Sequence, residues 1–129
     1  MFLNIETLRI FVWILFVRYF VTRFLEEADD FVSKLDQKSA NKVFYNIDLA
    51  EQTNDQKLFK KLKGEIWEFK SKYMGNQNRL FAFWDKTEKT ETLVLATHGF
   101  VKKTQKVPQK EIDKAERIRQ EYFKRRKKK

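Results

Sequence analysis

The sequence is poor in the residues that carry most specialised chemistry: its 129 residues include no cysteine, one histidine, one proline and three glycines. The absence of cysteine excludes a disulfide framework and thiolate chemistry. One histidine and scattered carboxylates give no cluster at a recognised metal-ligand spacing, so we expect neither a metal nor another cofactor. Long apolar runs are also missing, because IFVWILFV (10–17) has eight residues where a membrane span needs about 20.

Residues 1–16 form an apolar N-terminal extension to which the sequence assigns no role. It is not followed by the small-residue cleavage site of a signal peptide. We therefore expect a cytoplasmic protein without a membrane partner. A peripheral anchor, an extra strand and a translation start placed upstream of the true one are the remaining interpretations.

Charge is the main chemical resource of the chain, whose formal net charge is +10 at pH 7. Residues 25–55 carry eight acids against three lysines, a net of −5, whereas residues 57–72 carry six lysines against two glutamates, a net of +4. The last six residues, KRRKKK (124–129), add +6 and are expected to form a solvated basic tail. An acidic segment followed by a basic segment suits a protein that binds a polyanion on one side only. A generally soluble basic protein can have the same composition.

The spacing of apolar residues predicts an α+β domain with a small antiparallel sheet, two N-terminal helices and a C-terminal helix. The expected elements are a strand over 18–24, helices over 25–37 and 40–52, strands over 65–72, 78–85 and 91–98, a basic loop over 99–107 and a helix over 108–125. We expect Ser39 to cap the second helix and Pro108 to begin the last. Two or three helices should then pack on one face of the sheet.

Period-two alternation along the central strands sorts their side chains into two faces. One face is apolar and should lie under the helices. The opposite face then carries three cations beside two aromatic rings: Lys70, Lys72, Arg79, Phe81 and Phe83. Cations interleaved with aromatic rings are typical of single-stranded RNA binding. The alternative is that both phenylalanines belong to the core and the cations surround it, since one bulge would reverse the assignment.

Three motifs follow one another over the second half of the chain: LKGEIWE (62–68), GNQNRLFAF (75–83) and HGFVKKTQKVPQKEIDKA (98–115). TRFLEEADDFVSKL (22–35) fits the first strand and helix of the same pattern. Together these segments resemble the HigB/RelE-type toxins of bacterial toxin–antitoxin systems, specifically the phage-related HigB branch. Residues 1–16 have no counterpart in that pattern.

The resemblance implies a RelE-like domain over 17–123 that enters the ribosomal A site and cleaves messenger RNA there. It also implies a cognate helix-turn-helix antitoxin that covers the basic face. By the same resemblance Lys70 serves catalysis from a strand and Arg79 contacts the scissile phosphate. The segment before the last helix supplies lysines where other members use arginine, lysine or tyrosine: Lys102, Lys103 and Lys106.

Metal-free cleavage of RNA requires in-line attack by the 2′-hydroxyl, stabilisation of the phosphorane and movement of two protons. Arg79 can donate two hydrogen bonds to phosphate and keeps its charge. Lys70 could act as a base if Lys72 and Lys103 lower its pKa. His98 is the side chain poised near neutral pH, although a lone histidine at a strand end is more often structural.

The predicted site therefore has two groups of residues. The catalytic candidates are Lys70, Arg79, His98, Lys102, Lys103 and Lys106, and the RNA-binding candidates are Lys61, Lys63, Lys72, Phe81 and Phe83. Two other classes of function remain open. One is a non-catalytic growth inhibitor, such as a ParE-like gyrase poison on the same fold. The other is a plain nucleic-acid-binding module whose basic tail does most of the binding.

Overall fold

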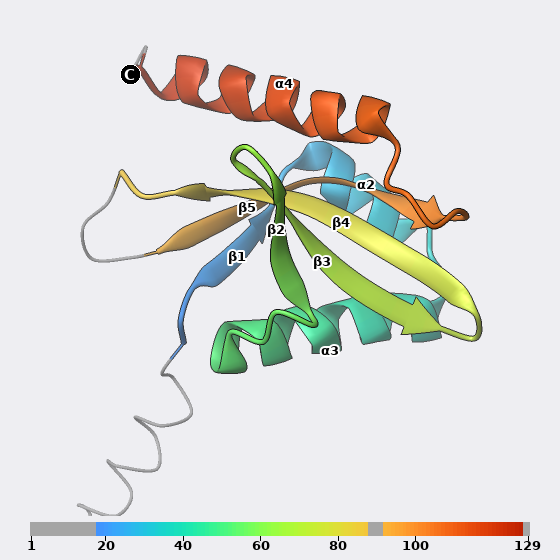
Figure 1. The fold of residues 1–129 in the computed structure, drawn as a ribbon. Helices are drawn as coiled ribbons and strands as arrows, with labels where there is room; N and C mark the ends of the chain where they lie inside the picture. Colours follow the sequence, from blue (N-terminus) through green and yellow to red (C-terminus); the bar gives the residue numbers. More distant parts are fainter. Residues whose placement is uncertain (1–17, 88–91, 128–129) are drawn as a thin grey trace, which may run out of the picture.

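The computed structural model describes residues 18–87 and 92–127 (Figure 1). Its elements are β1 (Val21–Phe24), α2 (Glu26–Ser33), α3 (Gln37–Thr53), β2 (Phe59–Lys63), β3 (Ile66–Tyr73), β4 (Asn76–Asp85), β5 (Leu93–Lys102) and α4 (Gln109–Lys127). The N-terminal extension predicted for 1–16 lies outside the described residues, as do 128–129 of the expected basic tail.

Within the described residues, the strands form one five-stranded sheet in the order β1-β5-β4-β3-β2. Strands β2 to β5 pair with their neighbours in antiparallel fashion, whereas β1 pairs with β5 in parallel. The expected sheet is therefore present, but it is mixed rather than wholly antiparallel. Two helices and the β2–β4 meander separate β1 from β5, so no hairpin forces these two strands to run in opposite directions.

Helices cover both faces of the sheet (Figure 1). Helices α2 and α3 lie on one face, where Val43 belongs to the same core cluster as Phe69. Helix α4 lies on the other face, where Ala115 shares a second cluster with Phe81 and Phe83. The two N-terminal helices therefore share one face of the sheet, as expected, whereas the C-terminal helix lies on the opposite face. Alternate residues of the central strands are apolar on both sides over part of their length, so each side must be covered.

Two strands differ from the sequence prediction. Strand β2 was missed, because its sequence FKKLK is dominated by lysine and hides the alternation of an edge strand. Gly64, with φ of +57°, forms the turn from β2 into β3. Strand β5 continues to Lys102, so the first four residues of the predicted 99–107 loop belong to the sheet. The start of the basic segment is thereby held in register with β4.

The helices also differ at their ends. The N-cap of α3 is Asp36, whose carboxylate accepts a hydrogen bond from the Ser39 backbone N–H at 3.1 Å, so the prediction of Ser39 as the cap is wrong. This contact, with the Ser39 hydroxyl as a further donor, lowers the pKa of Asp36. Helix α4 runs to Lys127, so residues 124–127 are exposed as expected but belong to the helix rather than to a separate tail. Cations suit this end of a helix because of the helix dipole.

A bulge shapes the middle of β5. Phe81 of β4 pairs with His98 and Ala82 with Ala96, which leaves Thr97 as the extra residue on β5. The Thr97 hydroxyl donates to the Phe81 carbonyl oxygen at 3.2 Å. Gly99 follows directly, and a Cβ at this position would overlap the ring of Phe31 from α2. A glycine here allows the helix to pack directly on the strand that carries the basic segment.

Candidate functional site

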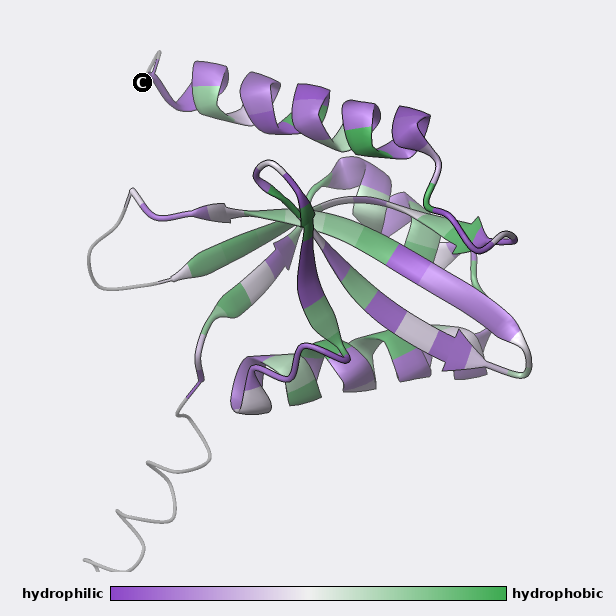
Figure 2. Ribbon diagram, viewed as in Figure 1, coloured by the Kyte–Doolittle hydropathy of each residue, from purple (hydrophilic) through white to green (hydrophobic). Residues whose placement is uncertain are grey.

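Helix α4 leaves part of its face of the sheet uncovered. Figure 1 shows the β3–β4 hairpin and the end of β5 extending past the first turn of α4, and Figure 2 shows hydrophilic residues at this end of the hairpin. The residues here pair across the strands in three successive rows: Lys60–Glu68–Phe81–His98, Lys70–Arg79–Phe100 and Lys72–Gln77–Lys102. We call the five cations of these rows the cationic face: Lys60, Lys70, Lys72, Arg79 and Lys102.

A buried carboxylate lies within the cationic face. Glu68 is 1% exposed, and its Oε2 lies 3.5 Å from Nε of Arg79. Arg79 is 7% exposed and donates from Nη2 to Oε1 of Gln77 at 2.8 Å. Its third nitrogen, Nη1, has no hydrogen-bond partner among the described residues. Glu68 and Gln77 therefore orient the guanidinium from two sides.

Lys70 has a perturbed amine. Burial, the neighbouring Lys60 and the charge of Arg79 lower the pKa of Lys70, while Glu68 opposes the shift. The sequence prediction named Lys72 and Lys103 as the cations that lower this pKa, whereas the structure shows Lys60 in that position. Lys60 lies opposite Glu68 because an irregularity between Lys61 and Lys63 shifts the register of the β2–β3 hairpin. Regular pairing counted back from the turn would place Lys61 there instead, so counting along the sequence would not have found Lys60.

His98 is a core residue. It is 3% exposed, its Nε2 lies 3.1 Å from Oε2 of Glu111 and its Nδ1 lies 3.1 Å from the Thr97 hydroxyl. Its ring also packs edge-on against Phe81. Burial lowers the pKa of His98, and the carboxylate of Glu111 partly offsets this effect. The prediction of His98 as a catalytic group is wrong, because both ring nitrogens face protein partners in the interior. The residue ties β5 to the first turn of α4.

Phe81 and Phe83 are also core residues. Both are 0% exposed, and they lie beneath α4 with Phe123 and Tyr122. The prediction that these rings stack on RNA bases is therefore wrong. Period-two parity placed them correctly on the face of Lys70 and Arg79. It could not show that α4 covers this half of the face.

The predicted RNA-binding lysines are divided by the sheet. Lys61 pairs with Trp67 and so lies on the α3 side of the sheet, on the face opposite Lys70. Lys63 lies near the start of α4, with Nζ 3.5 Å from Oε1 of Gln109. Lys72 is exposed in the outer row of the cationic face.

The basic segment after β5 brings more positive charge to the same end of the sheet. A groove of about 500 Å³ separates the β3–β4 turn from this segment, and Gln77, Lys102 and Lys103 line it. Lys106 is exposed, and its carbonyl oxygen accepts a hydrogen bond from the hydroxyl of Thr104 at 2.9 Å. Of the three predicted lysines, Lys102 lies within the cationic face and Lys103 lies at its margin.

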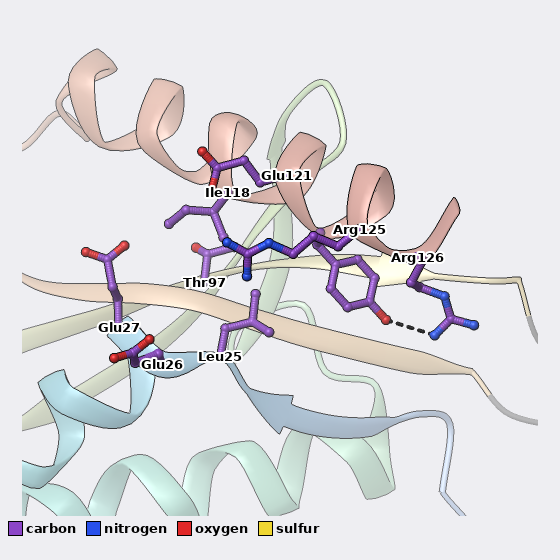
Figure 3. Close-up of a pocket in the computed structure, with 9 residues that line it drawn as sticks. Leu25, Glu26, Glu27, Thr97, Ile118, Glu121, Arg125 and Arg126 are labelled. Atoms are coloured by element: carbon purple, nitrogen blue, oxygen red, sulfur yellow. Dashed lines mark hydrogen bonds between the residues drawn. The ribbon is translucent and has the colours of Figure 1, made fainter. Parts of the chain in front are cut away.

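A second cavity, of about 480 Å³, lies on the other flank of α4 (Figure 3). Figure 3 shows Arg125 reaching from α4 toward Leu25, with Glu26 and Glu27 on the α2 side. Three glutamates and two arginines line this cavity together with apolar side chains. Acids and bases nearly balance here, so this cavity lacks the charge excess that favours a polyanion.

Two further searches cover the described part of the chain. No group of three or more histidine, aspartate or glutamate side chains is placed to hold a metal ion there. None of the helices in residues 18–87 and 92–127 is long and apolar enough to cross a bilayer.

The fold and the site together define a small basic α+β domain whose cationic face lies at one end of the sheet. The model of the phage-derived Gp49-like protein family matches residues 30–120, which is well over half of the chain. The chain therefore belongs to the phage-derived Gp49-like family, a toxin-like family of the RelE/ParE type. A comparison with curated proteins finds no match.

Proposed function

We propose that this protein is the toxin of a type II toxin–antitoxin system and acts as a metal-independent, ribosome-dependent mRNA endonuclease of the HigB-like branch. The observation that carries the proposal is the pairing of the partly buried Lys70, whose amine has a lowered pKa, with the buried and oriented guanidinium of Arg79 on one sheet face. Family membership supports the toxin class. The endonuclease activity is our inference from the chemistry of this face.

Three groups of the cationic face take part in this reaction. Lys70 in its neutral form removes the proton from the 2′-hydroxyl, and the resulting oxygen attacks the adjacent phosphorus in line. Arg79 donates from Nη1 to the phosphorane oxygens, where negative charge develops. A charged lysine of the same face gives a proton to the departing 5′-oxygen. The products are a 2′,3′-cyclic phosphate and a free 5′-hydroxyl, which balances atoms and charge.

The chemistry of this site suits an enzyme that depends on the ribosome to orient its RNA substrate. His98 is buried, so the acid–base groups at the face are lysines rather than an imidazole. Orienting the 2′-oxygen for in-line attack is worth several kcal/mol on general grounds, and a ribosome can supply that orientation in the A site. The partners in this proposal are ribosome-bound mRNA, the ribosome and a helix-turn-helix antitoxin that covers the cationic face in the cytoplasm.

Adjacent lysines on β2 provide a matched test. Lys60 lies on the cationic face and Lys61 on the opposite face, so K60A and K61A remove the same charge from neighbouring positions. We expect K60A to slow cleavage of mRNA on purified ribosomes by roughly ten- to a hundredfold, because Lys60 lowers the pKa of Lys70 and adds charge near the phosphate. K61A should behave as the wild type. New RNA 5′ ends mapped by primer extension give the readout.

Two further variants separate the proposal from its alternatives. Cuts phased with codons that disappear in K70A and R79K would support cleavage at this face, since lysine cannot reproduce the guanidinium fork. Intact messages with a DNA-damage response would indicate a gyrase poison instead. If deletion of 124–129 abolished activity while K70A and R79K did not change it, the protein would be a plain nucleic-acid-binding module.

A further inference from the structure

A groove of about 280 Å³ lies beside the cationic face, where the end of β5 meets the start of α4. Phe100 and Pro108 supply apolar surface to it, Lys103 and Lys110 supply positive charge, and Thr104 and Glu111 supply polar groups. Phe100 is the direct cross-strand partner of Arg79, and such partners have Cβ atoms about 4.5–5.5 Å apart. The groove therefore lies beside the strand position opposite Arg79.

The ring of Phe100 is held in place and is also accessible. It is only partly buried, unlike Phe81 and Phe83 on the same face. Its ring packs perpendicular to that of Phe81, with centroids 5.2 Å apart. A ring fixed in this way can stack on a planar ligand with little further loss of side-chain entropy.

A hydrogen-bond acceptor lies at the far side of the groove. Glu111, in the first turn of α4, holds His98 through Oε2 at 3.1 Å. Its other oxygen, Oε1, has no hydrogen-bond partner among the described residues. The same contact fixes the carboxylate, so Oε1 is a preorganised acceptor beside an aromatic ring.

We propose that this groove binds one unpaired RNA base next to the scissile phosphate, with the base stacked on Phe100 and its N–H edge read by Glu111. The inference rests on the proposed function for its link to cleavage. A carboxylate oxygen accepts from base N–H groups and repels base carbonyl oxygens. Guanine presents adjacent N–H donors to the single free oxygen, whereas uracil presents one donor between two carbonyls that the carboxylate repels, so the site favours guanine over uracil.

Charge around the groove agrees with a nucleotide rather than a neutral ligand. Lys103 and Lys110 line it, and Arg79 is the cross-strand neighbour of Phe100. A base in the groove would therefore place its flanking phosphates against cations on both sides.

The test measures stacking separately from cleavage. The probe is a short RNA that carries 2-aminopurine at one position. A 2′-O-methyl group at each position prevents cleavage, because it blocks attack by the 2′-oxygen. We expect quenching of the 2-aminopurine fluorescence on binding to the full-length protein. F100L should remove the quenching and weaken binding roughly tenfold, while F100W should restore both. Y45L is the matched control, because Tyr45 is an exposed aromatic residue on α3.

A second measurement tests the reading of the base edge. In the wild type, mapped cleavage sites should be enriched in guanine at one position next to the cut, and E111Q should reduce that enrichment at least several-fold. The thermal melt of E111Q shows whether the contact to His98 survives. Unchanged quenching and affinity in F100L, with F100L as stable as the wild type, would overturn the inference. Quenching that depends on Phe100 without any ribosomal cleavage would instead reject the proposed function and leave the base site intact.

Discussion

Gly99 allows a direct test of how α2 packs on the strand that leads into the basic segment. A Cβ at position 99 would overlap three atoms of the Phe31 ring. The ring must therefore move, and overpacking of this kind costs about 1–3 kcal/mol. A domain of this size loses roughly 4 °C or more in melting temperature per kcal/mol, so G99A should melt several degrees below the wild type.

A double-mutant cycle makes this prediction specific to the contact. F31A alone should destabilise the protein, because it removes a partly buried ring from the α2–α3 core. In the double variant F31A/G99A the new methyl group enters the space that the ring has left, so its cost should nearly vanish. The assay is urea unfolding of the four proteins, followed by far-UV circular dichroism. Equal costs of G99A with and without the Phe31 ring would refute this account of the packing.

Three further predictions concern titrating and buried polar groups. Because burial lowers the pKa of His98, the unfolded chain binds the proton more readily, so stability should be complete above about pH 6.5 and should fall as the pH drops below that value. H98N should flatten this dependence of the urea midpoint on pH. The rate of single-turnover cleavage should rise with pH as Lys70 loses its proton, and E68Q should move this rise to lower pH, because the charge of Glu68 raises the pKa of Lys70. A shift to higher pH would contradict the arrangement. Y122F should lower the free energy of unfolding by about 1–3 kcal/mol, because the Tyr122 hydroxyl donates to the buried carboxylate of Asp85 at 2.6 Å, and an unchanged urea midpoint would show that other donors satisfy that oxygen.

Local signals were strong enough to predict most elements. The helical spacing of apolar residues before residue 53 predicted α2 and α3, and the hairpin signals at Gly64 and Gly75 located the starts of β3 and β4 to within two residues. Pro108 correctly marked the start of α4. These features depend on neighbours within a few positions, which is why sequence patterns contain them.

Lysine-rich β2 shows where such reasoning fails. FKKLK has little strand propensity, and it forms a strand because β3 provides an edge with which it can pair. An irregularity between Lys61 and Lys63 then places Lys60 rather than Lys61 on the face of Lys70, which a regular count along the strand would not predict. The burial of Phe81, Phe83 and His98 was likewise decided by α4, which folds back over the sheet from a distant part of the chain.

The sequence by itself determined the class of fold, the excess of positive charge in its second half and the pairing of Lys70 with Arg79 on one face. All three follow from composition or from the period-two geometry of a strand, which hold wherever the strand lies. Only the tertiary structure decided which part of that face is open to a ligand. The reason is that exposure depends on where α4 lies, and its position is set by contacts between residues far apart in the chain. That placement buries the rings of Phe81 and Phe83 and leaves Phe100 and the lysines beside it accessible.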